Sequence, residues 1–240
     1  MKHLLLSLTV LSSPLCAEIA TADLSTTPVT QDAKWAKKWW MPRHEAKLKE
    51  KEALGEVQLV FIGDSITHAW ENKGKAIWNT HYAPYKALNL GYSGDRTEHV
   101  LWRIDNGELD GIKPKAIVIM IGTNNVGHRN EASKEVAEGI KAILDRLETK
   151  QPQAKILLLG IFPRGATSND PKRLLTDGTN AIIKNFHDGK RVFYLNINDK
   201  FLEKDGTLSK KVMPDLLHPS KAQYQVWANA IDPSLKKLMQ

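Results

Sequence analysis

The stretch VQLVFIGDSITHAW, residues 57–70, changes from a strand pattern to a helical pattern within three residues. Five of the six residues 57–62 are apolar, which predicts a short buried strand. Gly63 ends this strand, and either Asp64 or Ser65 can cap a following helix by accepting hydrogen bonds from its N–H groups. Two interpretations are open at this point. Ser65 is either an ordinary residue of a strand–turn–helix junction or a nucleophile at the carboxyl end of a strand, where open parallel sheets bind ligands.

Length and composition suit one globular domain with a substantial core, because the chain has 240 residues and 42% of them are hydrophobic. The net charge is +7, but the lysines are scattered and no basic stripe interleaves with aromatic residues. This pattern favours a solvated basic surface, and no nucleic-acid partner is expected. Weak attraction to acidic polysaccharide or anionic lipid stays open.

Residues 1–22 have the pattern of a secretory signal peptide, with a basic start, an apolar middle and small residues near two candidate cleavage positions, Ala17 and Ala22. The apolar middle is too short for a stable membrane anchor. Cleavage would remove Cys16, the single cysteine, and would leave no thiol nucleophile, disulfide or thiolate metal site. We therefore expect an exported protein, periplasmic or extracellular, with a flexible leader over residues 23–34 and one domain over residues 35–240.

Strand and helix patterns alternate along the rest of the chain. Strands are expected over residues 57–62, 87–90, 116–122, 155–160 and 191–196. Helices are expected over residues 35–54, 97–104, 131–148, 174–186 and from Pro219 to about Ile231. Near-continuous apolar strands between amphipathic helices indicate a parallel sheet covered on both faces, so the predicted fold class is α/β.

Residues that could take part in catalysis follow four of these strands. Ser65 follows the first strand, Gly94 the second, Asn124 the third, and the stretch MPDLLHPS with Asp215 and His218 the fifth. An aspartate three residues before a histidine can reach one nitrogen of the imidazole and leave the other for a serine. The sequence thus contains a nucleophile, an orienting acid and a base in the order serine, aspartate, histidine.

Each of these residues also has a structural interpretation. Gly94 suits a tight turn, Asn124 or Asn125 suits a helix cap, Asp215 suits a cap of the last helix, and His218 suits an exposed surface. A catalytic role is favoured over these structural roles because all of the residues are expected at one edge of one sheet. His68, His99 and His128 are interpreted as packing or surface residues, and no spacing predicts a metal site.

Four short blocks resemble the SGNH or GDSL hydrolase superfamily: GDS at 63–65, the Gly94 loop, GTNN at 122–125 and DLLH at 215–218. Longer stretches, such as residues 93–115, FPRG and MPDLLHPS, are similar to one branch, the catalytic subunits of type I platelet-activating factor acetylhydrolase. This similarity runs from about Trp35 to the end of the chain. The resemblance implies a flavodoxin-like three-layer α/β/α sandwich with a five-stranded parallel sheet, and an esterase without metal or organic cofactor.

The resemblance also implies roles for single residues. Ser65 would be the nucleophile, His218 the general base and Asp215 its orienting acid. The oxyanion hole would consist of the N–H groups of Ser65 and Gly94 together with the side-chain amide of Asn124.

Three further positions, Ile66, Thr123 and Leu217, fall where the branch lines its acyl pocket. The expected function is hydrolysis of short-chain, acetyl-type esters of an extracellular substrate such as an acetylated carbohydrate. A phospholipid or lysophospholipid esterase and a non-catalytic binding module are the alternatives, and the intact set of site residues argues against the module. The expected partner is a small-molecule or polysaccharide acyl ester, and a homodimer stays open.

Overall fold

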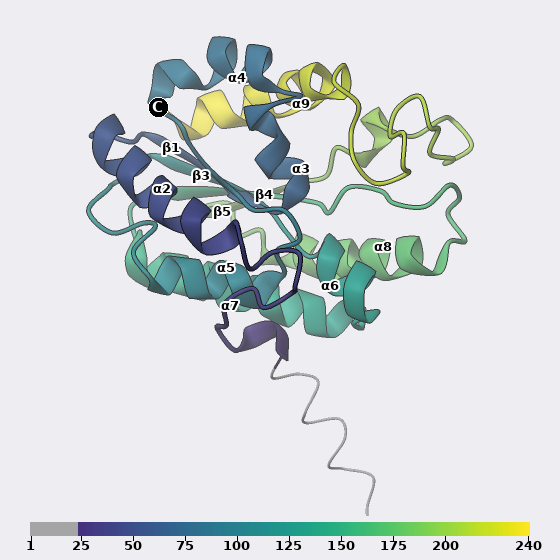
Figure 1. Cartoon of the computed structure of the whole chain (residues 1–240). Helices are drawn as coiled ribbons and strands as arrows, with labels where there is room; N and C mark the ends of the chain where they lie inside the picture. Colours follow the sequence, from purple (N-terminus) through teal and green to yellow (C-terminus); the bar gives the residue numbers. More distant parts are fainter. Residues whose placement is uncertain (1–23) are drawn as a thin grey trace, which may run out of the picture.

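The structure, a computed structural model, describes residues 24–240. The expected signal peptide lies outside these residues, and export therefore stays a prediction. A central sheet lies between two layers of helices (Figure 1). Among the described residues, none of the helices combines the length and the apolar character that a membrane span requires.

The sheet has five parallel strands in the order β2-β1-β3-β4-β5. The strands are β1 (Leu59–Gly63), β2 (Leu88–Gly91), β3 (Ala116–Met120), β4 (Lys155–Leu159) and β5 (Val192–Leu195). This is the flavodoxin-like order, and it confirms the predicted fold. The chain changes direction across the sheet between β2 and β3, and the gap between β1 and β3 is therefore the switch point at which such sheets bind ligands.

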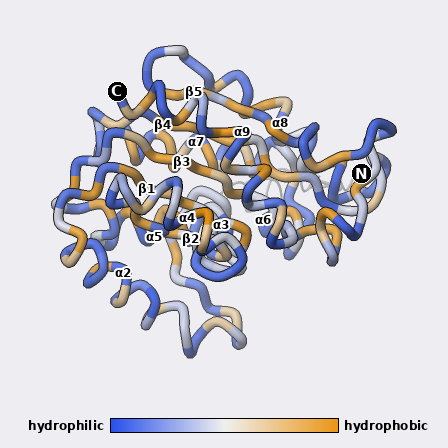
Figure 2. The backbone as a smooth tube through the Cα atoms, turned by 90° about the horizontal axis from the view of Figure 1, so that it is seen from above, coloured by the Kyte–Doolittle hydropathy of each residue, from blue (hydrophilic) through white to orange (hydrophobic). Residues whose placement is uncertain are grey.

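Successive strand residues point to opposite helix layers, as the pleat requires. In β1, Val60 and Ile62 pack with α5, α7 and α8, whereas Leu59 and Phe61 pack with the aromatic residues of α4 and α9. The first helix layer comprises α5 (Thr97–Asp105), α7 (Ser133–Lys150) and α8 (Pro171–Ile183). The second comprises α3 (Ser65–His68), α4 (Lys75–His81) and α9 (Gln223–Leu238). The hydropathy of the backbone follows this arrangement, with apolar strands inside and a largely hydrophilic α2 outside (Figure 2).

The helix expected from residue 35 begins later, because α2 spans Trp40–Leu54 and the residues before it form turns. Residues 24–34, which were expected to form a flexible leader, are hydrogen-bonded to the domain. The Ser25 hydroxyl donates to the Glu135 carbonyl oxygen at 2.9 Å, and Gln31 Nε2 donates to the Gly94 carbonyl oxygen at 3.2 Å. The domain boundary at residue 35 stays a prediction.

Candidate active site

The junction between β1 and α3 is built so that only glycine fits at its centre. A Cβ atom on Gly63 would lie 2.2 Å from Thr67 Oγ1 and 2.6 Å from the Met120 carbonyl oxygen. Asp64 is the residue that caps α3, since its Oδ1 accepts a hydrogen bond from the Ile66 N–H at 2.9 Å. Because Asp64 caps the helix, the half-buried hydroxyl of Ser65 is left for another partner.

That partner is His218, which approaches from a loop 153 residues further along the chain. Ser65 Oγ lies 2.8 Å from His218 Nε2, and Asp215 Oδ2 lies 2.6 Å from His218 Nδ1. Although burial raises the pKa of Asp215, hydrogen bonds from the backbone N–H and the imidazole of His218 outweigh it and lower that pKa. An ionised Asp215 accepts from Nδ1–H, so that Nε2 is free to accept the Ser65 proton. We call these three residues the Ser65–His218–Asp215 chain.

The turn that carries Asp215 and His218 contains a strained residue, Leu216, whose φ is +59°. A left-handed conformation of a non-glycine residue costs about 1–3 kcal/mol. Two backbone hydrogen bonds hold it: Leu216 N–H donates to the Met213 carbonyl oxygen at 2.8 Å, and its own carbonyl accepts from Gly165 N–H at 2.9 Å. The strain lets the turn fold back so that the Asp215 carboxylate reaches both the backbone and the ring of His218.

The two residues expected to complete the oxyanion hole meet at one loop. Gly94 has a φ of +78°, which favours glycine. Asn124 lies inside α6 (Thr123–Arg129) and does not cap it. Its Nδ2 donates to the carbonyl oxygen of Asp95, next to Gly94, at 2.9 Å. One amide hydrogen of Asn124 is thereby fixed, and its second hydrogen is available to a ligand.

A buried ionic network supports this loop, and the sequence did not predict it. Asp95 accepts from Trp40 Nε1 at 2.7 Å and from Arg103 Nε at 2.8 Å, and Arg103 also pairs with Glu108. The side chains of Asp95, Arg103 and Glu108 have no exposed surface. Removing one partner of such a buried pair typically costs 3–5 kcal/mol. The network therefore fixes the backbone next to Gly94 through side chains that lie far apart in the sequence.

The three residues expected to line an acyl pocket differ in their exposure. Ile66 and Thr123 are each 1% exposed and lie in the interior, whereas Leu217, next to His218, is half-buried. Arg164, from the FPRG stretch after β4, donates from Nη1 to the carbonyl oxygen of Thr123 at 2.6 Å and to its hydroxyl at 3.1 Å. Of the three, Leu217 is the one with appreciable accessible surface beside the Ser65–His218–Asp215 chain.

A second carboxylate lies directly behind Ser65. Burial raises the pKa of Asp64 to about 6, although the charges of His218 and Arg164 act in the opposite direction. With this pKa, Asp64 is mostly ionised at neutral pH.

A second serine–histidine pair lies at the same edge of the sheet and was not singled out by the sequence. Ser93 Oγ lies 3.0 Å from Nδ1 of His68, the last residue of α3. Burial, together with the nearby Arg43 cation, lowers the pKa of His68 to about 4. Such an imidazole is a weak base at neutral pH, which makes Ser93 the poorer nucleophile of the two.

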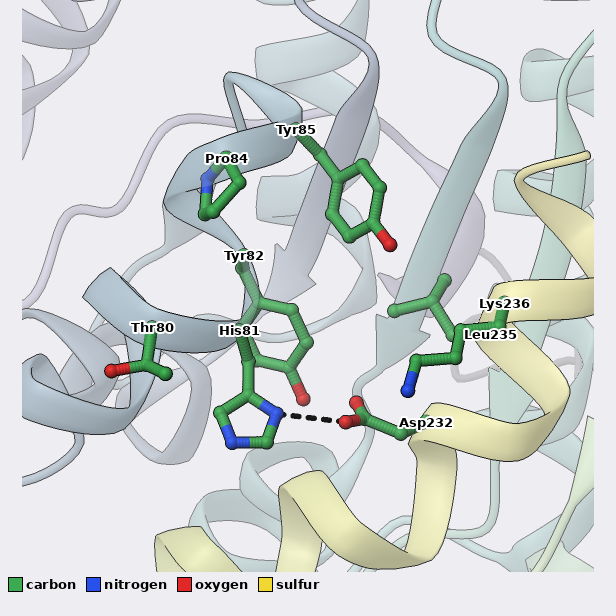
Figure 3. Close-up of a pocket in the computed structure, with 8 residues that line it drawn as sticks. All are labelled: Thr80, His81, Tyr82, Pro84, Tyr85, Asp232, Leu235 and Lys236. Carbon is green, nitrogen blue, oxygen red and sulfur yellow. Dashed lines mark hydrogen bonds and ion pairs between the residues drawn. The ribbon is translucent and has the colours of Figure 1, made fainter.

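The remaining features do not compete with this site. Within residues 24–240, no group of three or more His, Cys, Asp or Glu side chains could hold a metal ion. A pocket that contains a hydrogen bond between His81 Nδ1 and Asp232 Oδ2, at 2.7 Å, is shown in Figure 3. Its residues Tyr82, Pro84 and Tyr85 come directly before β2, so this pocket lies at the opposite, amino edge of the sheet.

A serine, a histidine and a carboxylate in one hydrogen-bonded series, at the carboxyl edge of a flavodoxin-like sheet, have the geometry of a serine hydrolase. Residues 61–226 match the model of the GDSL-like lipase/acylhydrolase family. The chain belongs to this family and is an ester hydrolase. The predicted superfamily is thereby confirmed.

Proteins with similar sequences support the same assignment, and similar solved structures support the fold. The chain is 38% identical over 214 residues to human platelet-activating factor acetylhydrolase IB subunit alpha1, covering 89% of both chains. It is 41% identical to the rat alpha2 subunit over 191 residues, covering 77% of this chain and 78% of that subunit. Among solved structures, a GDSL-like lipase from Bacteroides thetaiotaomicron has a TM-score of 0.63 at 20% identity, covering 81% and 97% of the two chains. An acetylxylan esterase from Geobacillus stearothermophilus has a TM-score of 0.61 at 20% identity, covering 77% and 95%.

Proposed function

We propose that this protein is an exported serine esterase that removes acetyl groups from a carbohydrate. The Ser65–His218–Asp215 chain supports the catalytic part of this proposal. One hydrogen bond of 2.8 Å joins Ser65 to His218, and a second of 2.6 Å joins His218 to Asp215. A non-catalytic module would have no need of this alignment.

In the proposed mechanism, His218 Nε2 takes the proton of Ser65 as Oγ attacks the ester carbonyl carbon. The N–H groups of Ser65 and Gly94 and the amide of Asn124 donate to the oxyanion of the tetrahedral intermediate. His218 then gives its proton to the leaving alcohol, and an acyl-Ser65 ester remains. Water, deprotonated by His218, attacks this ester and releases the acid and the Ser65 hydroxyl.

A small acyl group is favoured by the side chains around Ser65. Ile66, next to Ser65, and Thr123, next to Asn124, are packed into the interior, and the half-buried Leu217 directly precedes the base. Forcing a long chain into packed side chains typically costs about 1–3 kcal/mol, which corresponds to roughly 5- to 150-fold in rate.

Acetyl and propionyl esters should therefore be hydrolysed much faster than hexanoyl or octanoyl esters of the same alcohol. Leu217→Ala removes the accessible wall and should shift the optimum towards butyryl or longer chains. The measurement is kcat/KM across the series for both proteins. Leu238→Ala is the matched control, because Leu238 is also half-buried but lies at the end of α9, away from the site. The carbonyl oxygen of the next residue, Met239, accepts a hydrogen bond from Lys115 at the amino edge of the sheet. An octanoyl optimum in the wild type would remove the acetylesterase assignment.

The alcohol half of the ester distinguishes the proposed function from its main alternative. Identity of 38–41% to platelet-activating factor acetylhydrolase subunits favours an acetylated phospholipid as the second candidate. The signal-peptide pattern of residues 1–22 favours a substrate outside the cytoplasm, and an exposed tryptophan next to Gly94 favours a sugar. The homodimer stays a prediction.

Export has its own test. Protein recovered from the native host should lack the first 17 to 22 residues and should be found in the periplasm or the medium, because a signal peptidase removes such segments. N-terminal sequencing combined with cell fractionation measures both. An N-terminus at Met1, with the activity confined to the cytosol, would contradict export and would favour an intracellular lipid substrate.

A further inference from the structure

The turn before α2 places two tryptophans against the proposed oxyanion hole. A Cβ atom on Gly94 would lie 2.1 Å from Cη2 of Trp35, so the indole edge rests directly on the Gly94 backbone. Trp35 nevertheless remains 53% exposed, the largest exposed aromatic side chain among the described residues. A ring that packs by one edge and keeps half of its surface exposed is placed to contact a ligand bound at Gly94.

The second ring extends this surface towards the nucleophile. Trp39 stacks with Trp35 at a centroid distance of 6.0 Å and an interplanar angle of 27°. Trp39 also lies 6.1 Å from the ring of His68, which is three residues after Ser65 in α3. The aromatic surface formed by Trp35 and Trp39 therefore runs from Gly94 to the helix that begins with Ser65.

Polar groups border this surface. Nε2 of His68 lies 3.7 Å from a carboxylate oxygen of Glu71, and the two side chains are 25% and 35% exposed. An apolar face beside a few fixed hydrogen-bonding groups is the usual composition of a small-molecule site. Sugar rings match this composition, since they have an apolar C–H face and a rim of hydroxyl groups.

The surrounding charge argues against a cationic occupant. Three exposed lysines, Lys34, Lys37 and Lys38, lie within three residues of Trp35, against one exposed carboxylate, Asp32. Aromatic rings also bind quaternary ammonium groups, such as the choline of a phospholipid. Neighbouring positive charges would repel such a group, whereas they do not oppose a neutral or acidic sugar.

We propose that Trp35 and Trp39 form a subsite that binds a sugar ring of the alcohol half of the substrate. This inference deepens the proposed function and rests on it. The sugar would stack on the exposed face of Trp35 while its acetyl ester lies between Ser65 and Gly94.

The test compares two acetyl esters that differ in the alcohol, acetylated xylo-oligosaccharide and ethyl acetate. Trp35→Leu keeps an apolar contact with Gly94 but has no flat ring, and it should lower kcat/KM for the sugar ester at least tenfold more than for ethyl acetate. Trp35→Phe should recover most of this loss. Leu174→Ala, which removes an exposed apolar side chain on α8, should leave the ratio unchanged.

An equal loss on both esters would overturn the proposal, because it would show that Trp35 only packs on Gly94. A larger loss on an acetylated phosphocholine lipid than on the sugar ester would overturn it in favour of a choline subsite. Calorimetry with unacetylated xylotetraose and the Ser65→Ala protein tests the sugar subsite separately from the deacetylase function. Binding that Trp35→Leu abolishes supports the subsite even if the wild type deacetylates no sugar, and in that case only the proposed function fails.

Discussion

Replacing Ser65 with alanine is expected to lower kcat about a million-fold while the fold stays intact. The expectation follows from the 2.8 Å contact with His218, since removal of the nucleophile from such a chain leaves only the catalysis due to binding and the oxyanion hole. Hydrolysis of 4-nitrophenyl acetate by the purified proteins measures the loss, and circular dichroism with a thermal melt checks the fold.

Ser93→Ala is the matched control for this experiment. Ser93 also contacts a histidine, but the pKa of that histidine, His68, is lowered to about 4 by burial. Its replacement should cost less than about tenfold, because a weak base does little to activate a hydroxyl. A fluorophosphonate probe should label the wild type and the Ser93→Ala protein but not the Ser65→Ala protein. The reverse pattern would transfer the nucleophilic role to Ser93.

The second largest effect is expected at Asn124. Asn124→Ala should lower kcat by about 100- to 1000-fold with little change in KM, because a fixed donor to an oxyanion acts mainly in the transition state. The hydrogen bond to the Asp95 carbonyl oxygen is also lost, which should reduce stability by only about 1 kcal/mol. Steady-state kinetics and a melting curve on the same sample give both quantities.

The neighbouring Asn125 provides the contrast. Its Oδ1 accepts from the Thr97 N–H at the start of α5 at 3.1 Å, and its Nδ2 donates to Glu131 at 2.8 Å. Asn125→Ala should therefore lower the melting temperature and leave kcat within about tenfold of the wild type. If Asn124→Ala behaves like Asn125→Ala, with a stability loss and near-normal turnover, Asn124 has a structural role only.

The strands were predictable from the sequence because each is a short apolar run ended by glycine or a polar residue. The fold was predictable because helical patterns separate these runs and the short blocks resemble a known superfamily. The helices were harder to predict from the sequence. α6 was missed because Asn124, Asn125 and Gly127 are poor helix formers, and the helix that they form is held by tertiary contacts such as those of Asn125. α9 continues past the expected end through Pro233, which lies in its interior.

The residues of the Ser65–His218–Asp215 chain could be named in advance because each follows a strand or shares a turn with a partner. The residues that support the site could not be predicted. Asp95 is paired with Trp40, 55 residues earlier in the chain, and Gly94 is covered by Trp35 from a segment whose composition indicated a flexible leader or a plain helix start. Burial of Arg103 is likewise invisible in a sequence, since an arginine is buried only when three-dimensional partners neutralise it.

The position of His218 on the chain has a consequence for biosynthesis. All five strands are complete at Leu195, so a growing chain contains the whole sheet and Ser65 before His218 has been made. The residues that follow also include Tyr224, Trp227 and Ile231 of α9, which cover one face of the sheet. A chain that ends before residue 218 therefore contains Ser65 without its partner His218, and one face of its sheet is partly uncovered. If His218 is the base, as proposed, a chain interrupted before residue 218 is expected to be inactive, and its exposed apolar face is expected to favour aggregation.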